Sequence, residues 1–584
     1  MPLEGMLLPK KDATLPQDPL FSKLLKLATQ RGDQIIVDDC SRGVRFGYRH
    51  ILHGTVTLQQ QLQCLLDSSI LENRGGFFVA LLAPNGYEFI VGTLAVLALG
   101  GVVVPMPTGA LPAELSHMLQ QCRACYLLYG PEQIELAAQI RNETQIPSLA
   151  IESHVDDAAD SNLLPLTSYT LDPSLTVSEE CPSIVFFTSG TTGPPKGVLH
   201  PRRTITKYAL TSETEPPAED EICLIPRGAF WSLYFTKLFQ MLLLGVRVEI
   251  QNFGRNYDLI WEKFRERTGT KIVLSPTFWY GLMRYFEDHI SKLPEAVMRE
   301  YVEGFRYLRD VGMTGAMPSN RLREFWLELG GGRPLKVQYG ITETQEISVW
   351  EEGSGTSEAD LGTPFPNVIL KLSEGDEGEV LVKTPSLFLG YLNSPQSTAQ
   401  RFTPDGFFKT GDLATRHNGR YIFQGRENMD MFKFYTYKVP RLHVEHHLLA
   451  LPYIAEGYIL PVADPACDTR VAALVRFRSP GPPAARPPAT ATATATAPCL
   501  RVLREDLKGK MPAYQLPTVL RVLGEGEVVP RTWSDKVALG EVVGRFFGGD
   551  GMGDGIRDGE VEVWDVGGFM RGETERMWDL AGMR

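Results

Sequence analysis

Positive charge is scarce in this chain of 584 residues. Lysine and arginine together number 58, whereas aspartate and glutamate number 70, which gives a formal net charge of −12. Proteins that bind nucleic acids usually present an excess of basic side chains to the phosphate backbone. The composition therefore argues against a nucleic-acid partner, although it allows a local basic pocket for a small anion.

The chain also lacks a cysteine framework. Its eight cysteines are scattered, and Cys122 and Cys125 form a single C-x-x-C pair with no second pair beside it. We therefore predict neither a zinc site nor a redox centre. Reduced thiols in an intracellular compartment are the simpler interpretation.

No long apolar run is left uninterrupted. Residues 89–106 carry no charge, but Gly100-Gly101 and Pro105 break the run before it reaches the length of a membrane span. A buried helix near 87–99 and a strand at Val102–Val104 explain it better. The N-terminus has no apolar stretch of the secretory type, and the C-terminal Gly-Met-Arg is not a peroxisomal address. We expect a cytoplasmic protein with no membrane span.

What the chain does have is a short segment dense in glycine and hydroxyl side chains. An apolar run, Ile184–Phe187, reads as a buried strand, and it is followed by Thr188-Ser189-Gly190-Thr191-Thr192-Gly193-Pro194-Pro195-Lys196-Gly197. Glycine lets the backbone approach an anion, and N–H groups, hydroxyls and an ammonium group can surround phosphate oxygens. The order differs from the common phosphate loop, because Pro195 precedes Lys196 and Gly197 follows it.

Further motifs follow this loop in a fixed order. They are Tyr339-Gly340-Ile341-Thr342-Glu343, Gly362–Pro366, Gly378–Val380, Thr410-Gly411-Asp412, Gly425-Arg426 and Pro530–Lys536. The ordered set closely resembles the motifs of the AMP-forming acyl/aryl-CoA synthetases, a superfamily that also holds luciferases and the adenylation domains of peptide synthetases. The resemblance spans about residues 18 to 540.

The alternation of elements predicts the fold class. Strands at Phe77–Leu82, Val248–Ile250 and Lys271–Leu274 alternate with helical patterns, which is typical of an α/β fold with parallel sheets flanked by helices. The resemblance implies a large N-terminal AMP-binding (adenylation) domain over residues 18–429. It also implies a smaller, mobile α+β C-terminal domain over residues 430–540, with a hinge at Asp430.

Two segments look foreign to this fold. Residues 479–498 are rich in proline and then repeat Ala-Thr, so we expect a disordered insertion within the C-terminal domain. Residues 541–584 are rich in glycine and acidic side chains, and we expect a flexible tail there.

The resemblance implies a two-step reaction. A carboxylate attacks the α-phosphorus of ATP, which gives an acyl-adenylate and pyrophosphate, and a thiol, usually that of coenzyme A, then expels AMP. The protein must gather cations against phosphate charge and hold the carboxylate in line. We therefore predict an acid–thiol ligase that uses ATP, Mg²⁺, coenzyme A and a small carboxylic acid.

The same resemblance assigns roles to the motif residues. Glu343 would bind Mg²⁺, which prefers oxygen ligands, and Thr342 would contact the α-phosphate. Tyr339 and Gly340 would line the adenine slot. The residues expected to hold the β- and γ-phosphates are Thr188, Ser189, Gly190, Thr191, Thr192, Gly193 and Lys196.

Three more polar residues complete the predicted site. Asp412 would accept hydrogen bonds from the ribose hydroxyls, and Arg426 would donate near the ribose and phosphate. Lys536 would be the cation that stabilises the adenylation transition state, delivered by the C-terminal domain.

The expected acyl pocket favours an apolar or aryl carboxylate. Its walls would come from Trp231, Tyr234, Phe235, Thr277, Phe278, residues 311–316 and Ile341. Arg227 and Arg309 offer partners for the second carboxylate of a dicarboxylic acid. The chain departs from the family's motifs at Ala229, at Tyr435-Thr436 and at Asp535, so the first half-reaction is better supported than the second.

Two other functions stay open. The chain has no carrier domain with a phosphopantetheine serine motif, so an adenylate-forming enzyme could instead load a carrier protein in trans. A catalytically degraded nucleotide-binding relative would fit the low-complexity insertion, whereas the presence of Glu343, Asp412 and Lys536 argues against it.

Overall fold

The structure is a computed structural model of the chain. The residues that it describes are 13–153, 163–188, 195–210, 218, 220–226, 228–251, 256–350, 359–426, 431–434, 437–464, 468–478, 499–532, 536–548 and 561–564. The chain divides into two compact units. The first comprises Met1–Gly190, Pro195–Leu370 and Val382–Phe408, and the second comprises Thr191–Pro194, Lys371–Leu381 and Lys409–Arg584.

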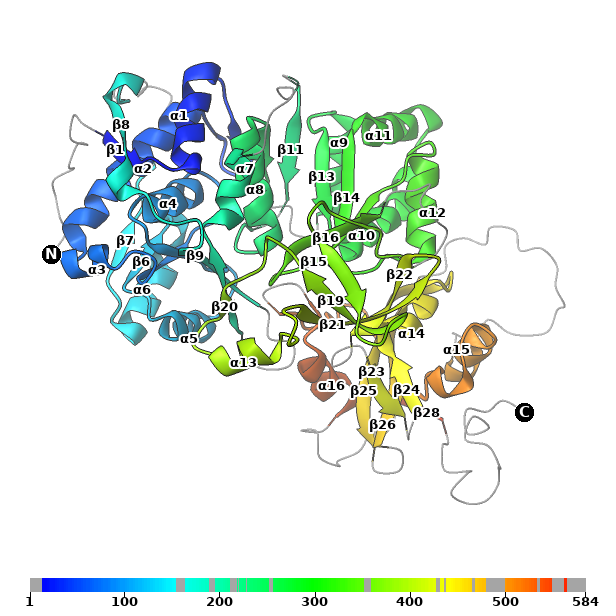
Figure 1. The fold of residues 1–584 in the computed structure, drawn as a ribbon. Helices are drawn as coiled ribbons and strands as arrows, with labels where there is room; N and C mark the ends of the chain where they lie inside the picture. Colours follow the sequence, from blue (N-terminus) through cyan, green and yellow to red (C-terminus); the bar gives the residue numbers. More distant parts are fainter. Residues whose placement is uncertain are drawn as a thin grey trace. The chain divides into compact units, whose positions relative to one another are not determined.

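A seven-stranded sheet in the first unit contains the two strands on either side of the glycine-rich segment (Figure 1). Strands β9, β5, β4, β6 and β7 are parallel, and β10 turns back antiparallel to β9. The spatial order is β20 (Gly390–Tyr391), β10 (Gly197–Pro201), β9 (Pro182–Phe187), β5 (Val102–Pro105), β4 (Phe78–Leu82), β6 (Tyr126–Tyr129) and β7 (Ser148–Ala150).

A nine-stranded sheet carries the Tyr-Gly-x-Thr-Glu motif. Its six central strands, from β15 to β2, are parallel, and antiparallel strands close both edges. The spatial order is β17 (Thr363–Pro364), β16 (Gln345–Trp350), β15 (Lys336–Ile341), β14 (Asp310–Thr314), β13 (Lys271–Leu274), β11 (Ile222–Ile225), β12 (Arg247–Ile250), β2 (Val37–Asp39) and β3 (Val44–Phe46). A separate parallel pair joins β1 (Ala13–Pro16) to β8 (Tyr169–Asp172).

Helices connect and cover these sheets (Figure 1). Those of the first unit are α1 (Pro19–Arg31), α2 (Tyr48–Leu65), α3 (Ser68–Glu72), α4 (Tyr87–Ala98), α5 (Pro112–Cys122), α6 (Ile134–Thr144), α7 (Arg203–Leu210), α8 (Ser232–Leu244), α9 (Tyr257–Arg265), α10 (Pro276–Asp288), α11 (Glu295–Tyr307), α12 (Asn320–Leu329) and α13 (Pro395–Gln400). The α/β architecture predicted from the sequence is confirmed.

The long uncharged run near residues 89–106 resolves into the predicted helix and strand. Every residue of α4 is buried, and Val102, Val103 and Val104 of β5 have no exposed surface. A strand in a parallel sheet is covered on both faces and therefore reads as a continuous apolar run. Among the described residues, no helix combines the length and the apolar character needed to cross a bilayer.

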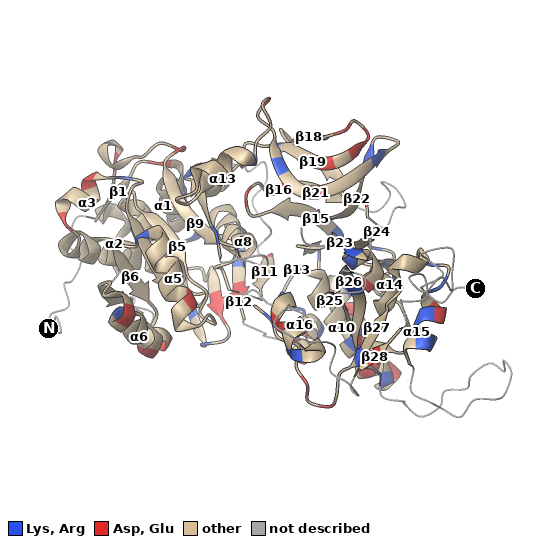
Figure 2. Cartoon of the chain, turned by 90° about the horizontal axis from the view of Figure 1, so that it is seen from below, with Lys and Arg blue, Asp and Glu red and all other residues tan. Residues whose placement is uncertain are grey.

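The second unit contains smaller sheets. One sheet has four strands, most of whose residues belong to this unit: β18 (Ile369–Leu372), β19 (Glu377–Lys383), β21 (Phe408–His417) and β22 (Arg420–Arg426). A hairpin is formed by β23 (Met431–Phe434) and β24 (Tyr437–Pro440). The third sheet consists of β25 (Ile454–Asp464), β26 (Asp468–Phe477), β27 (Val519–Val522) and β28 (Val561–Val563). Its helices are α14 (Arg441–Leu449), α15 (Leu500–Leu507) and α16 (Leu539–Phe547). Charges of both signs lie along helices such as α6 and α15 (Figure 2).

The predicted flexible tail over residues 541–584 is wrong for two stretches. Helix α16 buries Val542, Phe546 and Phe547, because these apolar residues recur at helical spacing despite the surrounding glycines. Strand β28 pairs antiparallel with β27. The rest of that segment, and the predicted insertion at 479–498, lie outside the described residues.

A buried ion pair joins the start of the first helix to Arg202, which lies between β10 and α7. Arg202 donates to the Asp18 carboxylate over 2.5 Å and to the Leu97 carbonyl over 2.9 Å, and the two side chains are 1% and 2% exposed. Asp18 also caps α1, because its other oxygen accepts from the N–H of Phe21. Losing one partner would leave the other charge buried without compensation.

We expect Arg202→Met to lower the free energy of unfolding by about 3–5 kcal/mol, because the Asp18 carboxylate would remain buried and unneutralised. Urea unfolding followed by tryptophan fluorescence measures this change. Arg299→Met is the matched control, since the Arg299–Glu295 pair is exposed by 64% and 78%, and it should cost less than about 1 kcal/mol. Equal losses in the two variants would contradict the expectation.

Candidate active site

The glycine-rich segment connects the two antiparallel strands β9 and β10. Strand β9 ends at Phe187, which lies opposite Gly197 at the start of β10. The N–H of Thr188 donates to the carbonyl of Lys196 over 3.0 Å, so the two ends of the connection are bonded together. Residues 189–194 lie outside the described residues, and the roles assigned to Ser189, Gly190, Thr191, Thr192 and Gly193 stay predictions.

Tyr391 joins this hairpin to the Thr-Glu motif. Its backbone pairs with Val198 of β10, and its ring centroid lies 5.9 Å from the Nζ atom of Lys196, within range of a cation–π contact. The Tyr391 hydroxyl donates to Oε1 of Glu343 over 2.7 Å. Two predicted site residues, Lys196 and Glu343, thus contact one tyrosine that the sequence analysis did not select.

The protonation state of Tyr391 follows from its surroundings. Burial, and then the neighbouring Glu343 carboxylate, raise the pKa of the phenol above its ordinary value. The hydroxyl therefore keeps its proton near neutral pH and acts as the donor to Glu343.

The turn that carries Thr342 and Glu343 has a specific backbone shape. Strand β15 runs into β16 through this turn, with a bulge between Tyr339 and Gly340. A Cβ atom on Gly340 would lie 2.4 Å from the Gln345 carbonyl oxygen, so only glycine fits this close approach. Gln345 closes the turn with a φ of 60°, which is rare for a residue with a side chain.

Two buried side chains fix the carbonyl of Thr342. The Nε2 atom of His200 lies 2.9 Å from this oxygen. Because a carbonyl oxygen can only accept, Nε2 must carry the hydrogen and act as the donor. Gln345 Nε2 donates to the same oxygen over 3.0 Å. Thr204 Oγ1 lies 3.4 Å from the other ring nitrogen of His200. The strand after the glycine-rich segment therefore holds the Thr342–Glu343 turn directly.

His200 is neutral in the folded protein. Its side chain has no exposed surface, and burial lowers the pKa of the imidazole to about 3, with the charges of Lys207 and Arg203 contributing in the same direction. A lone histidine in an apolar strand gives no sequence signal of this role, because its partner is a backbone atom 142 residues away.

In the second unit, Asp412 and Arg426 are neighbours. They face each other across β21 and β22, and Arg426 Nε donates to Oδ1 of Asp412 over 2.7 Å. The Asp412 side chain is 2% exposed and that of Arg426 is 34% exposed. The guanidinium thus orients a buried carboxylate at the end of a hairpin.

Lys536 lies on a narrow loop of the same unit. Its carbonyl accepts from the N–H of Thr532 over 2.8 Å, and the residue is exposed. Asp535 and the rest of the loop tip, residues 533–535, lie outside the described residues.

The residues expected to line the acyl pocket have diverse environments. Phe235 and Phe278 belong to the buried core, whereas Thr277, in the first turn of α10, is exposed. The Tyr234 hydroxyl donates to the Val273 carbonyl over 3.3 Å. The Ala229 N–H donates to the side-chain oxygen of Asn85.

Arg309 does not support the predicted second carboxylate site. Its guanidinium binds Asp220 through both nitrogens, and the two side chains are 43% and 53% exposed. Arg309 therefore already has a carboxylate partner on an exposed part of the chain. Arg227 lies outside the described residues.

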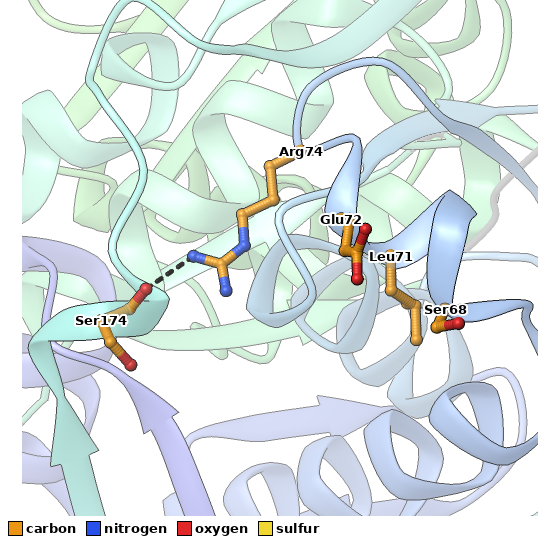
Figure 3. Close-up of a pocket in the computed structure, with 5 residues that line it drawn as sticks. All are labelled: Ser68, Leu71, Glu72, Arg74 and Ser174. Carbon is orange, nitrogen blue, oxygen red and sulfur yellow. Dashed lines mark hydrogen bonds between the residues drawn. The ribbon is translucent and has the colours of Figure 1, made fainter.

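One hollow of about 420 Å³ lies away from these motifs. It is lined by Ser68, Leu71, Glu72, Arg74 and Ser174 (Figure 3). Arg74 donates to the carbonyl of Ser174 over 2.8 Å. None of the predicted site residues lines it.

Comparison with known proteins identifies the family. The model of the family described as AMP-binding enzyme matches residues 67–392, which is more than half of the chain. The chain therefore belongs to the AMP-binding enzyme family.

Relatives in this family cover almost the whole chain. The acyl-CoA ligase oryP of Aspergillus oryzae is 44% identical over 563 residues, which are 96% of this chain and 98% of the relative. The mitochondrial malonate–CoA ligase ACSF3 of Bos taurus is 27% identical over 586 residues, which are 94% and 93% of the two chains.

Solved structures share the fold. ATP-bound MatB from Rhodopseudomonas palustris aligns with a TM-score of 0.71 at 19% identity, over 91% of this chain and 99% of that one. The o-succinylbenzoate–CoA synthetase MenE of Bacillus subtilis, in complex with its acyl-adenylate intermediate, aligns with a TM-score of 0.67 at 21% identity, over 88% and 96%.

These findings confirm the class predicted from the sequence. The chain is an enzyme of the AMP-forming acyl-CoA ligase type, which uses ATP and coenzyme A. The residue roles, the metal, the domain boundaries and the cytoplasmic location stay predictions.

His200 should make stability depend on pH in a defined window. In the unfolded chain the imidazole has an ordinary pKa of 6.5, whereas in the folded protein its pKa is about 3. Between these pH values the unfolded state is protonated and the folded state is not. Stability is therefore lost as the pH falls from 6.5 toward 3. We expect the urea midpoint to fall less between pH 7 and pH 5 in His200→Leu than in the wild type.

The control for this measurement is His117→Leu, because His117 is exposed on α5. This variant should follow the wild-type pH dependence. If His200→Leu lost stability with falling pH as steeply as the wild type, the neutral buried imidazole would be contradicted.

Proposed function

We propose that this enzyme activates a small carboxylic acid as its acyl-adenylate at the site around Lys196 and Glu343, and then transfers the acyl group to coenzyme A. The observation that supports this most is that Tyr391 contacts both the ammonium group of Lys196 and the carboxylate of Glu343. A triphosphate with a divalent cation needs such neighbouring opposite charges.

In the first step, the connection between β9 and β10 would hold the triphosphate. Lys196 and the hydroxyl of Thr188 would bind the β- and γ-phosphates together with the loop residues between them. Thr342 would contact the α-phosphate, while Tyr339 and Gly340 would line the adenine slot.

The residues present suit Mg²⁺. Glu343 is a partly buried carboxylate whose Oε1 atom accepts from Tyr391, and a carboxylate has a second oxygen for a hard cation. When bound, Mg²⁺ would neutralise phosphate charge during adenylation. Glu343 would hold it, and Tyr391 would orient the carboxylate.

The second unit would supply the ribose contacts and the catalytic cation. Asp412, oriented by Arg426, would accept from the ribose hydroxyls. Lys536 would stabilise the charge that develops on the α-phosphate. We propose the domain boundaries as residues 18–429 and 430–540, with Asp430 as the hinge.

Coenzyme A is the favoured acceptor over a carrier protein. The relative at 44% identity is named as an acyl-CoA ligase, and others are named as malonate–CoA ligases. A catalytically degraded relative fits less well, because Asp412 and Arg426 keep a well-formed hydrogen bond.

The acid has two candidate classes. An apolar or aryl carboxylate agrees with the aromatic side chains of Trp231 and Tyr234, whose rings lie 6.4 Å apart. A dicarboxylic acid is suggested by the names of the malonate–CoA ligases. Because Arg309 binds Asp220, a second carboxylate would need another partner, and Arg227 is the remaining candidate.

Pyrophosphate release tests the function. We expect release that requires both Mg²⁺ and one class of acid, in a panel of benzoate, cinnamate, octanoate and malonate, with acyl-CoA formed when coenzyme A is added. Release without any acyl-CoA would favour a carrier protein as acceptor. No release with any acid would contradict the proposal.

Lys536→Ala should abolish acid-dependent pyrophosphate release, because the cation at the adenylation transition state would be missing. ATP binding, measured by calorimetry, should change little, since the triphosphate contacts belong to the hairpin at Lys196. Lys508→Ala is the control, as Lys508 is an exposed lysine of the same unit that pairs with Glu505. Normal turnover in Lys536→Ala would show that another lysine acts.

A further inference from the structure

The segment that presents Lys536 ends in a short ladder. Arg531 and Val537 form an isolated bridge. The N–H of Thr532 donates to the Lys536 carbonyl over 2.8 Å, and the N–H of Ala538 donates to the Pro530 carbonyl over 3.1 Å. The backbone of Lys536 is therefore held by the segment opposite it, residues 530–532, which includes Arg531.

Tyr458 of β25 holds Arg531. The Arg531 guanidinium donates to the Tyr458 hydroxyl over 2.7 Å and lies 5.8 Å from the ring centroid. The same hydroxyl donates to Oε1 of Glu456 over 2.7 Å. Burial raises the pKa of the Tyr458 phenol, so one hydroxyl serves as donor and acceptor at once.

Glu456 extends this contact to the rest of the segment. Its second oxygen accepts from Arg476 Nε over 3.1 Å. Arg476 also donates to the carbonyls of Gly524 and Glu527 over 2.7 and 2.5 Å. The chain from Gly524 to Arg531 has little regular structure. Arg476 binds its first part, and Tyr458 binds its last residue, so both ends are attached to the sheet.

We propose that Tyr458 is a positioning residue for adenylation, which holds the Lys536 loop in place through Arg531. This role rests on the proposed function of Lys536. A displacement of about 1 Å in a group that acts on developing charge can cost roughly 100-fold in rate. In thiol transfer, the sulfur of coenzyme A forms a bond to the acyl carbon, the bond from that carbon to the AMP oxygen breaks, AMP leaves, and the thiol proton passes to solvent. Because the phosphorus atom is not attacked in this step, we expect it not to need the Lys536 cation.

The test is Tyr458→Phe, with the two half-reactions measured separately. Exchange of labelled pyrophosphate into ATP reports adenylation, using the most active acid of the panel. Coenzyme A added to the synthetic adenylate of that acid reports thiol transfer. We expect exchange to fall about 10- to 100-fold, while thiol transfer stays within about 2-fold of the wild type.

Tyr453→Phe is the matched control. The Tyr453 hydroxyl donates to a carboxylate oxygen of Asp506 over 2.6 Å in the same unit, so the chemical change is the same. Both half-reactions should stay within about 2-fold of the wild type. Since Tyr458 acts through Arg531, adding Arg531→Met to Tyr458→Phe should slow exchange little further.

The outcomes separate the two proposals. Equal slowing of both half-reactions in Tyr458→Phe, or unchanged exchange, would overturn the positioning role. Wild-type protein that shows no exchange with any acid would overturn the proposed function itself, and the role of Tyr458 with it.

Discussion

The site of the first unit depends on the two contacts of Tyr391, one with Lys196 of the hairpin and one with Glu343, 48 residues before it in the chain. A neutral phenol can accept a cation on its ring face and donate to an anion with its hydroxyl. Lys196 and Glu343 use these two features of the same side chain. The pairing of β20 with β10 fixes the backbone of Tyr391, so the residue that contacts both charges belongs to the edge strand of a sheet.

Hydrogen bonds fix the backbone that carries Glu343. The carbonyl of Thr342 is held by His200 and Gln345, and the Glu343 carbonyl accepts from the N–H of Phe388 over 2.8 Å. If Glu343 holds the metal beside the triphosphate, as we propose, such a preorganised backbone avoids the cost of reorganising during the reaction. The second unit follows the same design, since Arg426 orients Asp412 and Tyr458 anchors Arg531.

The sequence was sufficient for local features and insufficient for long-range partners. Apolar runs predicted β9, β5 and the buried helix α4, because each is determined by neighbouring residues. The ordered motifs predicted the enzyme class. His200, Tyr391 and Tyr458 were missed, since their partners are a distant carbonyl, a cation and a guanidinium. The glycine content of residues 541–584 led to the prediction of a flexible tail, although the apolar residues of α16 recur at helical spacing.

Strand β28 brings the far end of the described chain back onto a domain core. The Arg504 guanidinium carbon lies 4.3 Å from the centroid of the Trp564 ring, and the N–H of Leu500 donates to a carboxylate oxygen of Glu562. Residues Val561–Val563 pair with β27, about forty residues earlier in the chain. During synthesis, this sheet therefore stays incomplete until residue 564 leaves the ribosome, and the open edge of β27 is available to other strands until then.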